Sequence, residues 1–221
     1  MMDVDNNTNP IFDDFHKAYY YDSDNSMCVK WFGIPLAQKC PLDLWVYQEI
    51  IYEVKPTVVI ETGTGFGGTT MFLAHMLDLL GQGMVISVDS AIVDRPMHHR
   101  ISYVAGSSIA QDTIRIVKDL VMSKYRYRQD NITTLVLLDS DTSKDHVLEE
   151  LRVYSQMVSR GSYIIVCNTN LNGHPVHQEH GPGPMEAVKE FLYNNDRFQV
   201  DTSREKYGLT FNPMGYIKKR Y

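Results

Sequence analysis

Hydrophobic residues recur with two different spacings from residue 43 onwards, and the two spacings alternate along the chain. The segment 43–54 has its apolar residues at helical spacing and is predicted to be a helix. These apolar residues are Leu44, Val46, Tyr47, Ile50 and Ile51. A short, mostly apolar run at 57–61 is typical of a buried strand, and a glycine-rich turn then leads into a second helix that extends to Leu80.

The same alternation continues to the end of the chain. Further strands are predicted at 84–88, 101–104, 133–138, 162–166, 198–200 and 209–211. Further helices are predicted at 110–122, 143–157 and 185–193. This alternation favours an α/β fold, with a mostly parallel central sheet covered by helices on both faces.

The first forty residues do not follow this pattern. Residues 1–10 are polar and rich in Asn, and we interpret them as a loose leader, whereas residues 11–40 are aromatic and are predicted to be irregular. We therefore divide the chain into an N-terminal extension, 1–40, and one domain, 41–221. The extension is interpreted as a lid, as an oligomer contact or as a segment that fills one edge of the core.

Composition narrows the possible partners. The chain has 221 residues, 43% of them hydrophobic, which is enough for the core of one domain. Its net charge of -6 argues against a nucleic-acid partner. No apolar run approaches the roughly 20 residues of a membrane span, so we expect no membrane partner. An odd number of cysteines (Cys28, Cys40 and Cys167) and a start that does not resemble a signal peptide favour a cytoplasmic protein.

Polar residues follow several of the predicted strands at the point where each strand ends. They are Glu61, Asp89, Asp139 and the pair Cys167 and Asn168. Ligands of open α/β sheets bind beyond the carboxyl ends of the strands, where the strand order reverses. The sequence therefore predicts a binding site at this edge of the sheet.

The glycine-rich turn has a spacing that bears on the type of cofactor. It has the pattern G-x-G-x-G-G, with Gly63, Gly65 and Gly67, whereas a dinucleotide site has G-x-G-x-x-G. The pattern favours a cofactor without a pyrophosphate, whose charged amino acid end could meet Glu61. A carboxylate at Asp89 could accept hydrogen bonds from both hydroxyls of a ribose.

Several longer segments resemble a known family. They are IETGTGFGGTT (60–70), LVLLDSDTSKDHVLEEL (135–151), GSYIIVCNTNLNGHPV (161–176), GPGPMEAVKEFL (181–192) and LTFNPMGYIKK (209–219). Together they are similar to the cephalosporin hydroxylase and rhamnosyl O-methyltransferase family. The resemblance implies a Rossmann-like class I methyltransferase fold, S-adenosylmethionine as cofactor, and often a divalent metal, usually Mg²⁺.

The resemblance also implies the cofactor site. The cofactor-binding residues expected from the loop, the strand ends and the family's fold are Glu61, Gly63, Thr64, Gly65, Gly67, Asp89, Ser107, Ser108 and Asp139. The two serines follow the third predicted strand, in a region that lies near the adenine in this fold. A turn with a helix cap is the plainer interpretation of these serines.

The implied metal site departs from the family pattern at two positions. The metal ligands would be Asp139 and Asn168, but Cys167 replaces an expected acidic ligand, and Mg²⁺ prefers oxygen donors over thiolate. Thr142 stands where relatives carry His or Lys, either of which could act as a general base. We therefore expect metal dependence to be weakened or absent.

Three histidines in a proline-rich loop allow alternative chemistry. His174, His177 and His180 are three residues apart, a spacing that permits a zinc site, although a lid loop over the acceptor fits the prolines better. His174 or His177 is a candidate replacement base, and Asp139 and His174 are the expected catalytic residues.

The sequence thus predicts an S-adenosylmethionine-dependent methyltransferase that acts on a hydroxyl or amine of a small-molecule acceptor, natural product or sugar-like, and that forms a homo-oligomer. One alternative is a catalytically impaired, methyltransferase-like binding protein. The other is a nicotinamide-dependent oxidoreductase on a similar fold.

Overall fold

The computed structural model describes residues 10–22, 29–36, 38–125 and 132–221. Residues 1–9, most of the expected leader, and Cys28 lie outside the described residues. The helices are α1 (Pro10–Tyr21), α3 (Pro41–Val54), α4 (Gly68–Leu80), α5 (Gln111–Tyr125), α6 (Lys144–Tyr154) and α7 (Pro184–Tyr193). Two short 3-10 helices span Gln178–His180 and Thr202–Glu205. The strands are β1 (Lys30–Trp31), β2 (Ile34–Pro35), β3 (Val58–Thr62), β4 (Met84–Asp89), β5 (Ile101–Ala105), β6 (Thr134–Leu138), β7 (Tyr163–Val166), β8 (Phe198–Val200) and β9 (Tyr216–Lys219).

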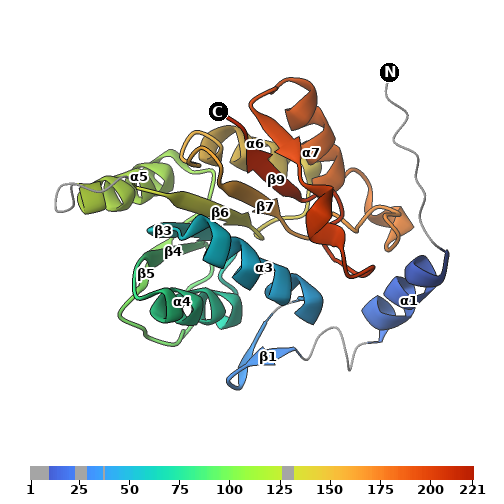
Figure 1. The fold of residues 1–221 in the computed structure, drawn as a ribbon, viewed down its shortest axis with the longest axis horizontal. Helices are drawn as coiled ribbons and strands as arrows, with labels where there is room; N and C mark the ends of the chain where they lie inside the picture. The colour runs from blue at the N-terminus through green and yellow to red at the C-terminus, as the bar shows by residue number, and fades with distance from the viewer. Residues whose placement is uncertain (1–9, 23–28, 37, 126–131) are drawn as a thin grey trace.

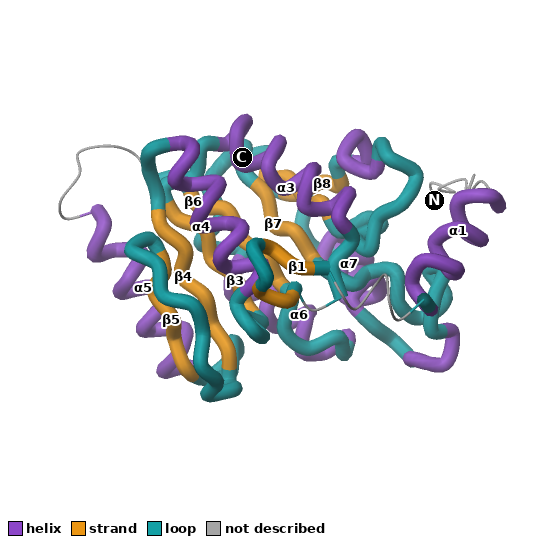
Figure 2. The backbone as a smooth tube through the Cα atoms, turned by 90° about the horizontal axis from the view of Figure 1, so that it is seen from below, coloured by secondary structure: helices purple, strands orange, loops and turns teal. Residues whose placement is uncertain are grey.

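A seven-stranded sheet with the order β5-β4-β3-β6-β7-β9-β8 forms the centre of the molecule (Figures 1 and 2). Strands β3 to β7 are parallel to one another, whereas β9 runs antiparallel to both β7 and β8. The first strand of the sheet, β3, lies between β4 and β6, so the strand order reverses there. This confirms the predicted α/β fold with a mostly parallel sheet, and it places the switch point at the carboxyl ends of β3 and β6.

Successive residues of the central strands point to opposite faces, and each face has its own apolar core. One core contains Ile60 and Val136 together with residues of α5, α6 and α7. The other core contains Val59 and Leu135 together with residues of α3 and α4. Because both faces are covered, these strands are buried on both sides, which explains why they are mostly apolar in sequence.

The predicted strand at 209–211 is wrong. Leu209 and Phe211 are buried, but the backbone there has no strand partner among the described residues. Instead, Phe211 N and Thr210 Oγ1 donate hydrogen bonds of 2.8 and 2.5 Å to the Asp43 carboxylate of α3. The strand that completes the sheet is β9, which follows five residues later.

The prediction that residues 11–40 are irregular is also wrong in part. This segment contains the helix α1 and the hairpin formed by β1 and β2. The helix buries His16 and Tyr20, and both rings pack against Phe211. Their spacing is helical, but the neighbouring exposed aromatic residues conceal it in the sequence. None of the described helices is both long and apolar enough to cross a membrane.

Candidate functional site

Two adjoining cavities lie at the carboxyl ends of β3, β4 and β6. They have volumes of about 270 and 260 Å³, and both are lined by Gly63, Asp89 and Ser140. The first continues towards β5 and is also lined by Ser107, Ser108, Asp141 and His146. The second continues towards β7 and the N-terminal segment, and its other lining residues include Gln38, Thr64, Gly65, Asp139, Thr142 and Asn168. The predicted switch-point site is therefore a groove that extends to both sides of the glycine loop.

The glycine loop approaches the backbone of β6 too closely for any side chain at its first glycine. A Cβ atom on Gly63 would lie 2.0 Å from the backbone oxygen of Asp139, and the residue has φ +83°. Gly65 N donates a 2.8 Å hydrogen bond to Asp89 Oδ2. The loop is thus bare backbone between the two cavities, and it is tied to the end of β4.

Glu61 lies beneath this loop rather than on the cavity surface. Its side chain is fully buried, and Oε2 accepts hydrogen bonds from Ser87 Oγ (2.5 Å) and from Thr70 Oγ1. Among the described residues, no group donates to Oε1. Burial raises the pKa of Glu61 to about 7, even though the two hydroxyl donors oppose the shift. Glu61 therefore reaches a cofactor only through the loop above it.

Asp89, by contrast, is on the wall of both cavities. Its Oδ1 accepts a 2.7 Å hydrogen bond from Ala91 N, and Arg95 Nη2 lies 3.3 Å from Oδ2. Arg95 Nε also donates to the carbonyl oxygen of Gly65 at 3.0 Å. The Asp89 carboxylate is thus fixed in orientation, with lone pairs left for a ligand hydroxyl.

The two serines after β5 line the first cavity together with a histidine that the sequence analysis did not select. Ser108 Oγ lies 3.0 Å from His146 Nε2, and Ser140 Oγ lies 3.2 Å from the same atom. The buried Glu150 raises the pKa of His146 through a hydrogen bond and its charge. His146 lies in the first turn of α6, and its distance from Ser108 in sequence gives no signal of this contact.

Asp139 lines the second cavity and contacts two other polar side chains. Lys39 Nζ lies 2.6 Å from Asp139 Oδ2, and the two side chains are 3% and 9% exposed. Asn168 Nδ2 donates a 3.1 Å hydrogen bond to Asp139 Oδ1. Burial alone would lower the pKa of Lys39, but the Asp139 carboxylate raises it above its usual value. The two groups form a buried ion pair that the sequence analysis missed, since Lys39 precedes the expected domain.

Cys167 lies behind this ion pair. Its Sγ is 3.4 Å from the hydroxyl of Tyr47, and the residue is 3% exposed. Burial raises the pKa of the Cys167 thiol to about 12, so the sulfur is a neutral thiol at pH 7. Cys167 is therefore a buried structural thiol.

These residues do not fit a Mg²⁺ ion well. Asp139 is the only carboxylate among the three positions of the expected ligand set, and both of its oxygens already face donors. Asn168 turns its NH₂ group towards Asp139, so its amide oxygen points elsewhere, and Cys167 offers a neutral thiol. Magnesium prefers several hard oxygen donors in octahedral geometry. The only group of three potential metal-ligating side chains found among the described residues is elsewhere, at Asp78, His98 and His99.

The three loop histidines do not come together. His174 Nε2 lies 2.8 Å from Glu186 Oε1, and His177 packs against Tyr20 and Tyr21 of α1. His180 Nε2 lies 3.0 Å from the hydroxyl of Thr142, which lines the second cavity. His174 lines neither of the two cavities described above. The loop thus brings a different histidine, His180, to Thr142 in the wall of the second cavity.

Known proteins match this chain over nearly its whole length. The model of the family described as Rhamnosyl O-methyltransferase/CmcI matches residues 23–220. A rhamnosyl O-methyltransferase of Mycobacterium leprae (strain TN) is 33% identical over 223 residues, covering 96% of this chain and 92% of that protein. A solved structure of CmcI with Mg and SAM has TM-score 0.62 and 14% identity, covering 87% of this chain and 77% of that one. CmcI with SAH has TM-score 0.58 and 13% identity, covering 86% of this chain and 81% of that one.

The sequence matches and the fold agree. The solved structures are similar to this chain in overall fold, and at their low identity they show the fold alone. The family model and the mycobacterial protein match the chain in sequence, and their matches include the glycine loop and the strand ends that form the groove. The chain therefore belongs to the rhamnosyl O-methyltransferase/CmcI family of S-adenosylmethionine-dependent methyltransferases.

Proposed function

We propose that this methyltransferase transfers a methyl group to a hydroxyl of a small, sugar-like or natural-product acceptor, without an obligatory divalent metal. The observation that supports the proposal best is the pair of adjoining cavities, which both have Gly63 and Asp89 in their walls. The name of the mycobacterial relative favours a sugar hydroxyl as acceptor. An amine is the alternative nucleophile, since its neutral form already carries a lone pair.

The residues of the groove fit S-adenosylmethionine. The absence of a Cβ at Gly63 lets the loop lie directly against the backbone that follows β6, and Asp89 has free lone pairs for ribose hydroxyls. Ser107, Ser108 and His146 surround the end of the groove where the adenine is expected. When bound, the cofactor supplies a methyl group on a sulfonium sulfur. Acceptor attack breaks the carbon–sulfur bond, which leaves a neutral thioether.

The acceptor would bind in the second cavity. The Asp139 carboxylate and the Thr142 hydroxyl line this cavity and can align an acceptor hydroxyl by hydrogen bonds. Transfer from a sulfonium depends largely on alignment and proximity, which such fixed side chains supply. The neutral thiol of Cys167 and the single carboxylate, Asp139, support weak or absent Mg²⁺ dependence.

The hydroxyl group that receives the methyl group must lose its proton to a base, and we look for this base near Thr142. We infer that His180 is the base candidate in preference to His174, because His180, unlike His174, contacts the Thr142 hydroxyl of the second cavity. His180→Ala is expected to lower kcat about 10²-fold, and His174→Ala far less. Measurement of kcat for both variants with one methylated acceptor decides between them. Equal losses would remove the preference for His180.

Calorimetric titration with S-adenosylhomocysteine, in Mg²⁺ and in excess chelator, tests the proposed function first. We expect tight binding in both buffers, followed by chelator-resistant methyl transfer in a panel of hydroxylated acceptors. Binding without product in that panel would favour the catalytically impaired alternative. Failure to bind in either buffer would contradict the cofactor site, and activity only with Mg²⁺ would contradict metal independence.

A further inference from the structure

Lys39 connects the N-terminal segment to the acceptor wall. It lies between the β1–β2 hairpin and α3, about a hundred residues from Asp139 in sequence, yet its ammonium is 2.6 Å from the Asp139 carboxylate. Its neighbour Gln38 lines the same cavity. The N-terminal segment is therefore part of the site, and it brings in a positive charge.

The surroundings of this charge are nearly free of solvent. Lys39 is 2% exposed as a whole residue, and the polar groups that face it are Asp139, the Cys167 thiol and, more distantly, the carboxyl groups of Asp43 on α3 and Glu61 on β3. Asp43 is itself held by Thr210, Phe211 and Tyr216. A buried charge persists only where an opposite charge and hydrogen bonds balance it, and Asp139 is the carboxylate in contact with Lys39.

A divalent cation on Asp139 would meet this ammonium at close range. The expected ligand set offers one carboxylate, and Lys39 already neutralises it. Like charges this close repel strongly in a site shielded from water. The charge balance of the site therefore favours an empty metal position as long as Lys39 is present.

We propose that Lys39 is a positioning residue whose ammonium replaces the divalent cation: through the 2.6 Å ion pair it holds the Asp139 carboxylate oriented towards the acceptor, and it excludes metal. This inference rests on the proposed function, because it assigns Asp139 to the acceptor cavity. It explains how the chain keeps an acidic residue at the end of β6 although Cys167 and Asn168 leave a poor ligand set. Lys39 acts through Asp139, since the lysine itself does not line the cavity.

Mn²⁺ binding provides a test that does not depend on turnover. Mn²⁺ takes the same oxygen ligands as Mg²⁺, and free and bound ions are distinguished by paramagnetic resonance. The decisive pair is Cys167→Asp with Lys39 retained, and Cys167→Asp combined with Lys39→Met. Both carry the added carboxylate, and they differ only in the ammonium. Adding Asp139→Asn to the double variant assigns the bound ion to Asp139, separately from any Mn²⁺ at the exposed Asp78, His98 and His99 group.

We expect the double variant to bind Mn²⁺ at least about tenfold more tightly than Cys167→Asp alone, and Asp139→Asn to abolish the gain. Equal affinity in the two backgrounds would overturn the proposal. So would a Mn²⁺ ion on the unmodified protein that Asp139→Asn removes. This last measurement remains decisive even where a Lys39→Met variant fails to fold.

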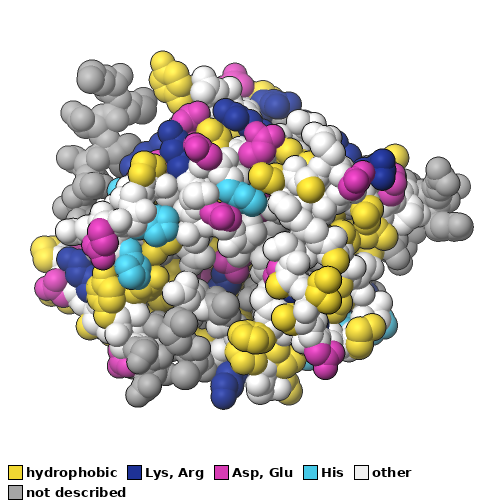
Figure 3. All heavy atoms as spheres, turned by 180° about the vertical axis from the view of Figure 1, so that it is seen from behind, with side chains coloured by type: hydrophobic (Ala, Val, Ile, Leu, Met, Phe, Trp, Pro, Cys, Tyr) yellow, Lys and Arg dark blue, Asp and Glu magenta, His cyan; other side chains and the backbone are white. Residues whose placement is uncertain are grey.

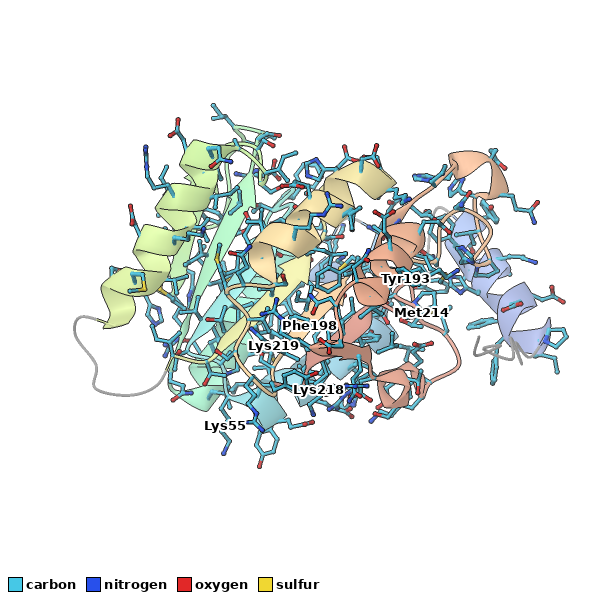
Figure 4. All side chains as sticks on the ribbon, turned by 90° about the horizontal axis from the view of Figure 1, so that it is seen from above. Lys55, Tyr193, Phe198, Met214, Lys218 and Lys219 are labelled. Atoms are coloured by element: carbon cyan, nitrogen blue, oxygen red, sulfur yellow. The ribbon has the colours of Figure 1, made fainter. Side chains whose placement is uncertain are left out.

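Activity adds a second readout. Lys39→Gln keeps a donor to Asp139 but loses the charge, and it is expected to lower kcat about tenfold with little change in KM for the cofactor. Lys219→Met is the matched control: Lys219 is partly buried on β9, donates to Val158 O at 2.7 Å and lies over the ring of Phe198 (Figure 4). Full activity of Lys39→Gln in chelator would contradict the role of the charge. If the unmodified protein does not bind S-adenosylhomocysteine at all, the proposed function is contradicted. The Mn²⁺ comparison would still test the role of Lys39.

Discussion

Gly63 shows at the scale of one residue how the loop creates the groove. Its positive φ and the 2.0 Å approach of a Cβ to the Asp139 backbone oxygen leave no space for alanine. Gly63→Ala is expected to weaken S-adenosylhomocysteine binding at least about tenfold, because the loop must move away from β6. Calorimetry measures the loss.

Gly81 provides the matched control for this substitution. It also has positive φ, +68°, but a Cβ there would meet no atom within 4 Å. Gly81→Ala therefore carries a similar backbone strain without the contact, and it is expected to leave the affinity unchanged. A similar loss of affinity in both variants would show that backbone strain, and not the close approach, governs binding.

Glu61 is a second residue whose burial has a measurable consequence. Its folded pKa, about 7, exceeds the ordinary value of 4.5, because burial disfavours the charged form. The stability that Glu61 contributes is therefore full below about pH 4.5 and is lost as the pH rises through 7. Glu61→Gln mimics the protonated form, so it should gain up to about 3 kcal/mol relative to the unmodified protein between pH 5 and pH 9.

Urea unfolding of the cofactor-free protein at several pH values measures this difference. Glu179→Gln, in the exposed 3-10 helix before α7, serves as the control and should follow the unmodified protein. A constant difference between Glu61→Gln and the unmodified protein across this pH range would show that Glu61 does not titrate there.

At the scale of elements, α1 is held to the domain by a buried histidine. Asn170 Nδ2 lies 3.0 Å from His16 Nε2, and the His16 ring stacks on Phe211 with centroids 5.4 Å apart. Burial lowers the pKa of His16 to about 4, so the neutral ring accepts the hydrogen bond from Asn170. The docking of α1 therefore depends on an uncharged His16.

Acidification should release α1 before the rest of the domain. Because the folded pKa is depressed, the contribution of His16 is full above about pH 6.5 and is lost as the pH falls through 4, by up to about 3 kcal/mol. Hydrogen exchange of the α1 amides at pH 7 and pH 4.5 measures the release. His16→Leu should remove the pH dependence, whereas His99→Ala, at an exposed ring, should retain it. Uniform protection of α1 at both pH values would refute the docking role.

The strands also show how much of the fold can be predicted from the sequence. The strands β3, β4, β6 and β7 were located to within one residue, since buried parallel strands are short apolar runs with polar ends. The strand β9 was missed because Lys218 and Lys219 interrupt its apolar pattern, while the buried Phe211 segment imitates a strand. The glycine loop and Asp139 could be found from local spacing. The role of Lys39 could not be predicted, because it depends on a contact with Asp139 that only the folded chain creates.

At the scale of the whole molecule, the distribution of charged side chains on the surface indicates which kinds of partner the protein can bind. The face in Figure 3 mixes acidic, basic and histidine side chains with apolar ones, and it shows no continuous basic patch. This is consistent with the acidic net charge and with the expectation of a small-molecule substrate. The groove at the carboxyl ends of the strands is then the main candidate for substrate binding.

The helix α1 at the periphery of the molecule (Figure 1) bears on the expected homo-oligomer. It buries only His16 and Tyr20, and leaves the large apolar side chains of Phe15 and Tyr21 more than half exposed. Exposed apolar side chains gathered on one helix are typical of protein contact surfaces.

We expect light scattering to give a mass that is a multiple of 25.4 kDa, and Phe15→Glu to reduce this mass to that of one chain. Leu79→Glu, an equally drastic change on the exposed side of α4, should leave the assembly intact. A single-chain mass for the unmodified protein would contradict the homo-oligomer, and the contacts of α1 with Phe211 and His177 would then favour a segment that fills one edge of the core.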